Sequence, residues 1–282
     1  MLSELFRLTR FEHALMLAFA VLIAEAITLG SLPPLEFYII LSLLVPMLSE
    51  MGSFALNDYF DAESDRANKK LDRPLVKGTI SPVFAWNFSV ACLGLSTILA
   101  FFINFYAFGI ALAFNAFAVL YNWKLKDTPL FGNIYIAFTM AIPFIFGNYV
   151  ISQQLSLLIM VLALLGFVAG LAREIIKSVQ DMEGDFAARG ARTLPVLIGR
   201  DASLAMAVLL YLVFLPLTYL PFILMGVPRP GAALIVIADA LIVLVCIRII
   251  TEQDYRFARN MSLIAFFLGM VGILLASFPL PQ

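Results

Sequence analysis

The fold is decided by residues 39–65, IILSLLVPMLSEMGSFALNDYFDAESD, in which an apolar run passes directly into a cluster of acidic residues. Apolar runs of roughly 17 to 23 residues recur along the chain, and each is long enough to cross about 30 Å of hydrocarbon. The 282 residues are 62% hydrophobic and 13% charged, with a mean hydropathy of +0.99. A soluble domain usually carries about 25% charged residues to coat its core. The composition therefore predicts a protein whose solvent is lipid.

The predicted membrane helices span residues 14–30, 36–57, 82–102, 105–121, 130–149, 155–176, 203–225, 231–250 and 260–278. We expect an all-α, polytopic membrane protein with about nine transmembrane helices around a central cavity, folded as a single domain over residues 1–282. Eight or ten helices remain open, since the third and fourth runs are poorly separated and prolines interrupt the seventh.

Charge segregation supports a count of nine. With nine helices, every basic residue except Arg229 falls on one side of the membrane. Because lysine and arginine are enriched in cytoplasmic loops, we expect a multi-pass protein of the cell membrane whose charged face lies in the cytoplasm. Two long segments on that face, 57–81 and 177–202, could form a cap over the cavity.

Both long segments begin with acids in a D-x-x-x-D spacing, Asp61 with Asp65 and Asp181 with Asp185. The two pairs lie 120 positions apart, and duplication of a four-helix unit would explain the offset. If the preceding helix continues, Asn57, Asp61 and Asp65 follow one another at intervals of four along one face.

Acids concentrated in this way repel one another unless a cation neutralises them. Mg²⁺ prefers hard oxygen ligands and is usually held by one or two carboxylates together with water and substrate phosphates. Two facing acidic clusters would hold Mg²⁺ against a diphosphate, while nearby arginine and lysine side chains take the remaining phosphate charge. The two acidic segments are therefore candidates for a magnesium–diphosphate site.

The stretch NDYFDAESD followed by RANKKLDRPLVKGTIS resembles the first motif of the UbiA superfamily of intramembrane prenyltransferases. REIIKSVQDMEGDFAARGARTLPVLIG is similar to the second motif of that family. The resemblance covers essentially the whole chain. It implies a Mg²⁺-dependent enzyme that transfers a prenyl group from a prenyl diphosphate, such as geranylgeranyl diphosphate, to an acceptor within the membrane.

The resemblance also implies roles for individual residues. The implied metal ligands are Asn57, Asp61, Asp65, Asp181 and Asp185. The catalytic candidates are Asp61, Asp65, Asp181, Asp185 and Lys124. The substrate-binding candidates are Asn57, Asp58, Arg66, Arg73, Tyr121, Lys126, Lys177, Arg192, Arg10 and His13. The spacing does not choose between Lys124 and Lys126 as the diphosphate ligand. Arg10 and His13, one turn apart, could neutralise an anionic acceptor.

The acceptor stays open at this point. AREIIKSVQDMEGDFAARGARTLP resembles archaeal enzymes that prenylate geranylgeranylglyceryl phosphate in ether-lipid synthesis, whereas the opening RFEH resembles members that prenylate aromatic acids on the way to quinones. Membrane lipid is an expected partner and nucleic acid is not. The main rival is a secondary transporter, which would use mid-membrane carboxylates; Glu25, Glu50 and Asp239 are the candidates.

Overall fold

The computed structural model describes residues 2–226 and 230–278, which form helices and no strands. Within these residues, nine helices are long and apolar enough to cross a membrane. This confirms the predicted all-α, polytopic fold. Arg229, the one basic residue assigned to the opposite side, lies outside the described residues.

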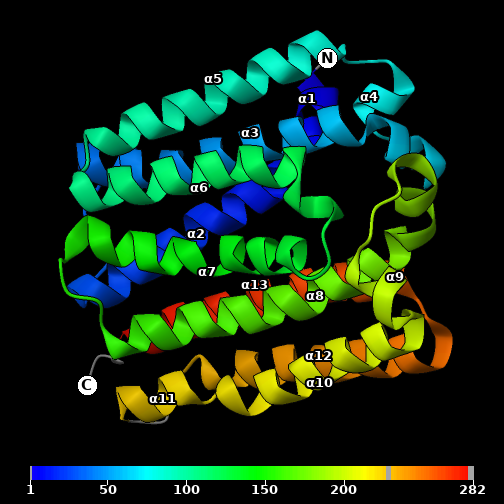
Figure 1. Ribbon diagram of the computed structural model, residues 1–282. Helices are drawn as coiled ribbons and strands as arrows, with labels where there is room; N and C mark the ends of the chain where they lie inside the picture. Colours follow the sequence, from blue (N-terminus) through cyan, green and yellow to red (C-terminus); the bar gives the residue numbers. More distant parts are fainter. Residues whose placement is uncertain (1, 227–229, 279–282) are drawn as a thin grey trace.

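The long helices run side by side along the molecule (Figure 1). They are α2 (Phe11–Leu29), α3 (Phe37–Ala67), α5 (Pro82–Phe101), α6 (Phe105–Trp123), α7 (Phe131–Ile151), α8 (Leu157–Arg189), α10 (Arg200–Leu217) with its continuation α11 (Leu220–Met225), α12 (Ala232–Glu252) and α13 (Tyr255–Ser277). The short ones are α1 (Leu2–Thr9), α4 (Pro74–Lys77), α9 (Leu194–Ile198) and the 3₁₀ turn η1 (Leu125–Asp127). In Figure 1, α4 and α9 lie at the same end of the bundle as the N-terminus.

Helices are the outcome because lipid offers no hydrogen-bond partners, so each membrane segment must satisfy its own backbone groups. The helix starts are set by local capping signals. Asn104 Oδ1 accepts a hydrogen bond of 2.8 Å from the Ala107 amide, and Asp254 Oδ1 accepts one of 2.9 Å from the Phe257 amide. Such side-chain caps satisfy amides that have no partner inside the helix.

The helices α3 and α8 extend beyond their predicted ends at residues 57 and 176. Residues 58–67 and 177–189, which continue these helices, contain no proline, so no proline breaks the helix where the apolar run stops. α8 ends only where Gly190 takes the left-handed conformation at φ 64°. Both Asp-rich motifs are therefore helical, and the expected cap stays a prediction.

Helices α2 and α7 pack at backbone distance. A Cβ added to Gly147 on α7 would lie 2.6 Å from the Val21 carbonyl oxygen on α2, so only glycine permits this approach. Small residues commonly allow such contacts between membrane helices. Side chains of α7 line two separate apolar cavities, which are described with the site.

Candidate active site

Asp61 lies at the centre of the first cluster. Its Oδ1 is contacted by the Lys126 ammonium from η1 and by Arg189 Nη1 from α8. Asn57, one turn earlier on α3, donates a hydrogen bond of 2.8 Å to Asp61 Oδ2 and one of 3.1 Å to Asn122 Oδ1 on α6. The continuous helix thus brings Asn57 and Asp61 together as the spacing predicted.

The two motifs meet at Lys70, in the turn after α3. Its Nζ lies 3.2 Å from Asp65 Oδ1 and 2.8 Å from Asp181 Oδ2, so one ammonium joins an acid of each motif. Burial lowers the pKa of Lys70, but the two carboxylates outweigh burial and the net pKa is raised above its ordinary value. The lysine is therefore charged at neutral pH.

Asp58 is almost fully buried, with 1% exposure, and is paired with two arginines. Arg10 Nη2 donates to Asp58 Oδ1 at 2.8 Å, and Arg73 Nη1 donates to the same atom at 3.1 Å. The Arg10 guanidinium also lies over the Phe54 ring, 4.1 Å from its centroid. Arg10 is thereby engaged by the first motif instead of being held free for an acceptor.

Asp185, the second acid of the second motif, contacts a residue of its own helix α8 and a residue at the end of α3. Arg189 Nη2 lies 3.1 Å from Asp185 Oδ2, and Asn68 Nδ2 donates to Asp185 Oδ1 at 3.1 Å. The ends of α3 and α8 approach closely here, because a Cβ on Gly184 would fall 2.2 Å from the Asn68 side chain. Gly184 therefore permits the contact that aligns the two motifs.

The two candidate lysines after α6 lie in different surroundings. Lys126 is buried against Asp61, whereas Lys124 is exposed and lies over the Trp123 ring at 5.5 Å. The pKa of Lys126 is lowered from its ordinary value because burial outweighs the attraction of Asp61. The placement favours Lys126 as the diphosphate ligand, and the catalytic role predicted for Lys124 has no contact in its support.

The remaining candidates divide between cluster and surface. Tyr121 is buried beside the cluster and stacks on Tyr135 with ring centroids 4.9 Å apart. His13 packs its ring against Phe54 at 5.4 Å. Arg66 and Arg192 are exposed, and Lys177 pairs with Glu174 at 3.1 Å and not with an aspartate of either motif.

Sequence reasoning missed Lys70, Asn68, Asp127 and Arg189 as members of the site. Arg189 is the most connected of these, since its Nε also lies 2.7 Å from Asp127 Oδ1. A signal for it existed, because Arg189 continues the four-residue spacing of Asp181 and Asp185 along α8. No comparable spacing pointed to Lys70, which lies in a turn.

The carboxylates fit a hard cation shared with a ligand. Within the described residues, no three His, Cys, Asp or Glu side chains converge as a ready metal site. Mg²⁺ at phosphate sites, however, needs only one or two protein carboxylates. Asp65 and Asp181 already share one cationic group, and Asp58 Oδ2 is buried without a hydrogen-bond partner in the described part of the chain.

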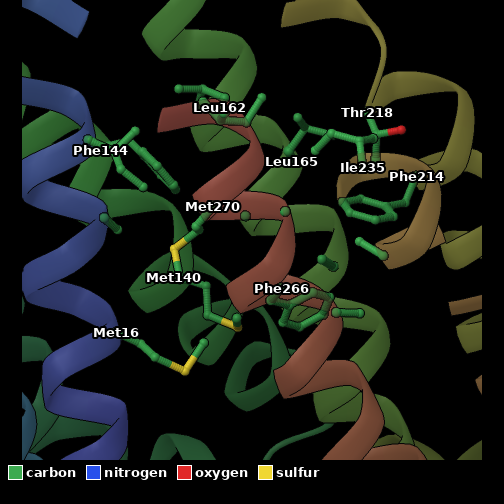
Figure 2. Close-up of a pocket in the computed structure, with 18 of the residues that line it drawn as sticks. Met16, Met140, Phe144, Leu162, Leu165, Phe214, Thr218, Ile235, Phe266 and Met270 are labelled. Carbon is green, nitrogen blue, oxygen red and sulfur yellow. The ribbon is translucent and has the colours of Figure 1, made fainter. Parts of the chain in front are cut away.

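Two apolar cavities lie beneath the clusters, on opposite faces of α7. The first, here the α13 cavity, has with its opening about 880 Å³ of space free of protein atoms. Figure 2 shows Met16, Met140, Met270, Phe144, Phe214 and Phe266 around it. The second, the α3 cavity, has about 530 Å³ and is lined by side chains including Glu50, Ser53, Ala118 and Tyr135. Leu17 of α2 lines both.

Membrane-length helices, acidic motifs that meet at one end and apolar cavities below them are features expected of an intramembrane enzyme. The chain belongs to the UbiA prenyltransferase family, whose model matches residues 16–271. It is accordingly a prenyltransferase, and membership sets aside the transporter alternative.

Similar proteins cover almost the full length of the chain. Digeranylgeranylglyceryl phosphate synthase of Archaeoglobus fulgidus is 34% identical over 98% of this chain and 96% of the relative. The enzyme of the same name from Thermococcus kodakarensis is 33% identical over 96% of each chain. A solved structure of digeranylgeranylglyceryl phosphate synthase aligns with a TM-score of 0.72 at 28% identity, covering 98% of both chains.

A UbiA homologue from Archaeoglobus fulgidus, solved with GPP and Mg²⁺ bound, aligns with a TM-score of 0.68 at 23% identity, over 96% of this chain and 99% of the homologue. At this identity the likeness supports the fold. This chain therefore shares its fold with the solved UbiA homologue.

Proposed function

We propose that the chain transfers the geranylgeranyl group of geranylgeranyl diphosphate to geranylgeranylglyceryl phosphate, in a Mg²⁺-dependent reaction at the cytoplasmic face of the membrane. The observation that carries the proposal is the junction of Asp65 and Asp181 at Lys70, which brings both acidic motifs to one point. The similarity to digeranylgeranylglyceryl phosphate synthases over nearly the whole chain supports this acceptor. The basic residues gathered at the same end support the orientation.

The α3 cavity suits the tail of the donor. Its lining residue Ser53 lies four residues before Asn57 on α3, and Ala118 lies four residues before Asn122 on α6. Four residues make about one helical turn, or 6 Å of rise. A diphosphate held at Asn57 and Asp61 would therefore lie directly above this apolar space, with its prenyl chain below.

In the reaction, the hydroxyl oxygen of the acceptor forms a bond to C1 of the prenyl diphosphate. The bond from C1 to the diphosphate oxygen breaks, and pyrophosphate leaves with the hydroxyl proton. Lys126, Arg189 and Arg73 lie among the acids and would hold the diphosphate charge. The apolar cavities exclude water, which would otherwise compete with the acceptor.

The acids proposed to hold Mg²⁺ are Asp61, Asp65, Asp181 and Asp185, with Asn57 as a further ligand. Bound Mg²⁺ supplies Lewis-acid stabilisation of the charge that develops on the leaving diphosphate. The basic side chains now on these acids would turn toward the diphosphate, since a phosphate oxygen is as good a partner for them as a carboxylate.

The contacts of Arg10 and His13 bear on the acceptor role predicted for these two residues. That role would need a free cation near the start of α2, where both residues lie. Arg10 is instead bonded to Asp58, and the His13 ring is packed on Phe54. An acceptor with a phosphate must therefore find its cations elsewhere.

A competition assay tests the proposal. Purified protein in lipid nanodiscs receives Mg²⁺, geranylgeranyl diphosphate and, together, geranylgeranylglyceryl phosphate and a panel of aromatic acids. Mass spectrometry identifies the products. We expect the doubly prenylated glycerol phosphate as the main product. A prenylated aromatic acid as the main product would overturn the proposed acceptor while leaving the enzyme class intact.

A further inference from the structure

A second cationic site lies outside the Asp-rich clusters, in a pocket between α8, α10 and α13. We call it the basic pocket and define it by Arg173, Lys177, Tyr211, Tyr255, Arg259 and Ser262. With its opening it has about 220 Å³ of space free of protein atoms. No acidic side chain lines it among the described residues.

Two of the three basic side chains of the pocket make no ion pair within the described residues. In the Asp-rich clusters Arg10, Lys126 and Arg189 each contact an aspartate. In the described part of the chain, by contrast, Arg173 and Arg259 make no ion pair, and Lys177 pairs only with Glu174. The Arg173 Nε is also buried without a hydrogen-bond partner there. Buried donors of this kind are costly unless a ligand satisfies them, so the pocket is suited to an anion.

The basic pocket sits directly above the α13 cavity. On α8 the basic pocket includes Arg173 and the cavity includes Ala169, four residues away. On α10 the corresponding residues are Tyr211 and Phe214, three apart. These intervals correspond to about 4.5 to 6 Å along a helix.

The same step occurs on the third helix, α13, where Ser262 belongs to the basic pocket and Ala265 to the cavity. On all three helices, therefore, the lining changes from cationic and polar to apolar within one turn. The combined shape matches an amphiphile with an anionic head and a long apolar chain.

We propose that the basic pocket binds the phosphate of the prenylated glycerol phosphate acceptor, with its prenyl chain in the α13 cavity. This inference rests on the proposed function and assigns the acceptor site within it. Donor and acceptor chains then lie on opposite faces of α7. Lys177 precedes Asp181 by one helical turn on α8, so a phosphate at Lys177 places the hydroxyl on the adjacent glycerol carbon close to the donor site.

The test compares Arg259→Gln with Arg256→Gln, both on α13. Arg256 is exposed and is not part of the basic pocket, which makes it a matched control for charge. The KM values for geranylgeranylglyceryl phosphate and for geranylgeranyl diphosphate are measured in nanodiscs of phosphatidylcholine, with and without added phosphatidylglycerol. Losing one charged hydrogen bond to a phosphate should raise the acceptor KM about tenfold or more in Arg259→Gln.

In Arg259→Gln we expect the acceptor KM to rise by this factor and the donor KM to stay within about twofold of wild type. Both results should be the same in the two lipid mixtures. In Arg256→Gln both KM values should change little, because exposed charges contribute little. An unchanged donor KM also reports that the variant is folded. An unchanged acceptor KM in Arg259→Gln would overturn the inference and leave the proposed function standing. The inference would also be overturned if Arg259→Gln changed only the degree to which phosphatidylglycerol inhibits the reaction, because the pocket would then bind a lipid headgroup. If wild type fails to prenylate the glycerol phosphate at all, the proposed function falls first.

Discussion

Lys126 and Lys124 offer a controlled test of how the structure places the donor diphosphate. The two lysines are two residues apart in one short segment, yet the side chain of Lys126 is only 6% exposed and contacts Asp61. It also lies 5.4 Å from the centroid of the Phe60 ring. Lys124 is exposed. The pair therefore separates the effect of position from the effect of losing one positive charge.

The size of the effect follows from these contacts. Removing one partner of a buried ion pair lowers the free energy of unfolding by about 3–5 kcal/mol, but Arg189 still contacts Asp61 and reduces this loss of stability. A charged hydrogen bond contributes about 1.5–3 kcal/mol. At about 1.36 kcal/mol per tenfold change, Lys126→Ala should raise the Kd for geranylgeranyl diphosphate roughly 10- to 150-fold. Lys124→Ala should change it by about threefold at most, because exposed charges contribute little.

The assay is displacement of radiolabelled geranylgeranyl diphosphate from each variant in nanodiscs, with the Tm of each variant as the control for folding. Equal weakening by both substitutions would refute the reasoning, since it would mean that total charge and not position determines binding. A Lys126→Ala variant that loses only acceptor affinity would also refute it and would move this lysine to the acceptor side.

Three further predictions concern the junction of the two motifs. Asp181→Ala should abolish turnover while the protein remains folded in the membrane, and excess EDTA should do the same to wild type; full activity in either case would contradict the metal assignment. Gly184→Ala should lower kcat and Tm together, because the new Cβ would displace Asn68; activity and Tm equal to those of wild type would show that the helices separate without cost. The contribution of Lys70 to stability should be lost when the pH rises far into the alkaline range. Its folded-state pKa is raised, so the ion pairs are fully present below the unfolded value of about 10.4 and disappear as the pH rises through the folded value. The Tm difference between wild type and Lys70→Met should be flat from about pH 6 to 9 and shrink above about pH 10.5; a decrease below pH 9 would contradict this.

Most of the fold was predictable because each step depends on local composition. Apolar length determines which segments cross the membrane, and the basic residues determine which ends share a face. The shared face of Asn57, Asp61 and Asp65 followed from their spacing once the helix was assumed to continue past residue 57. These features need no knowledge of which helices are neighbours.

The partner of each acid could not be predicted, because it depends on contacts between helices distant in sequence. Arg189 reaches Asp61 across 128 positions, and Lys126 reaches it across 65. The 3₁₀ turn η1 interrupts the helical periodicity after Trp123, so no helix pattern could say which lysine turns inward. Arg66 and Arg192 look like Arg73 in the sequence, yet both are exposed, whereas Arg73 is partly buried and pairs with Asp58.

The arrangement explains how one enzyme could keep two similar substrates apart. Both proposed substrates carry a geranylgeranyl chain and a phosphate-containing head, so chain chemistry cannot discriminate between them. The heads differ in charge and geometry, and the two proposed head sites differ correspondingly. The donor site is rich in carboxylates, which bind a diphosphate through a metal, whereas the basic pocket has cations and needs none. Lys70 holds the helices of the two sites together at Asp65 and Asp181, so the bond between the substrates would form at the junction of the two motifs.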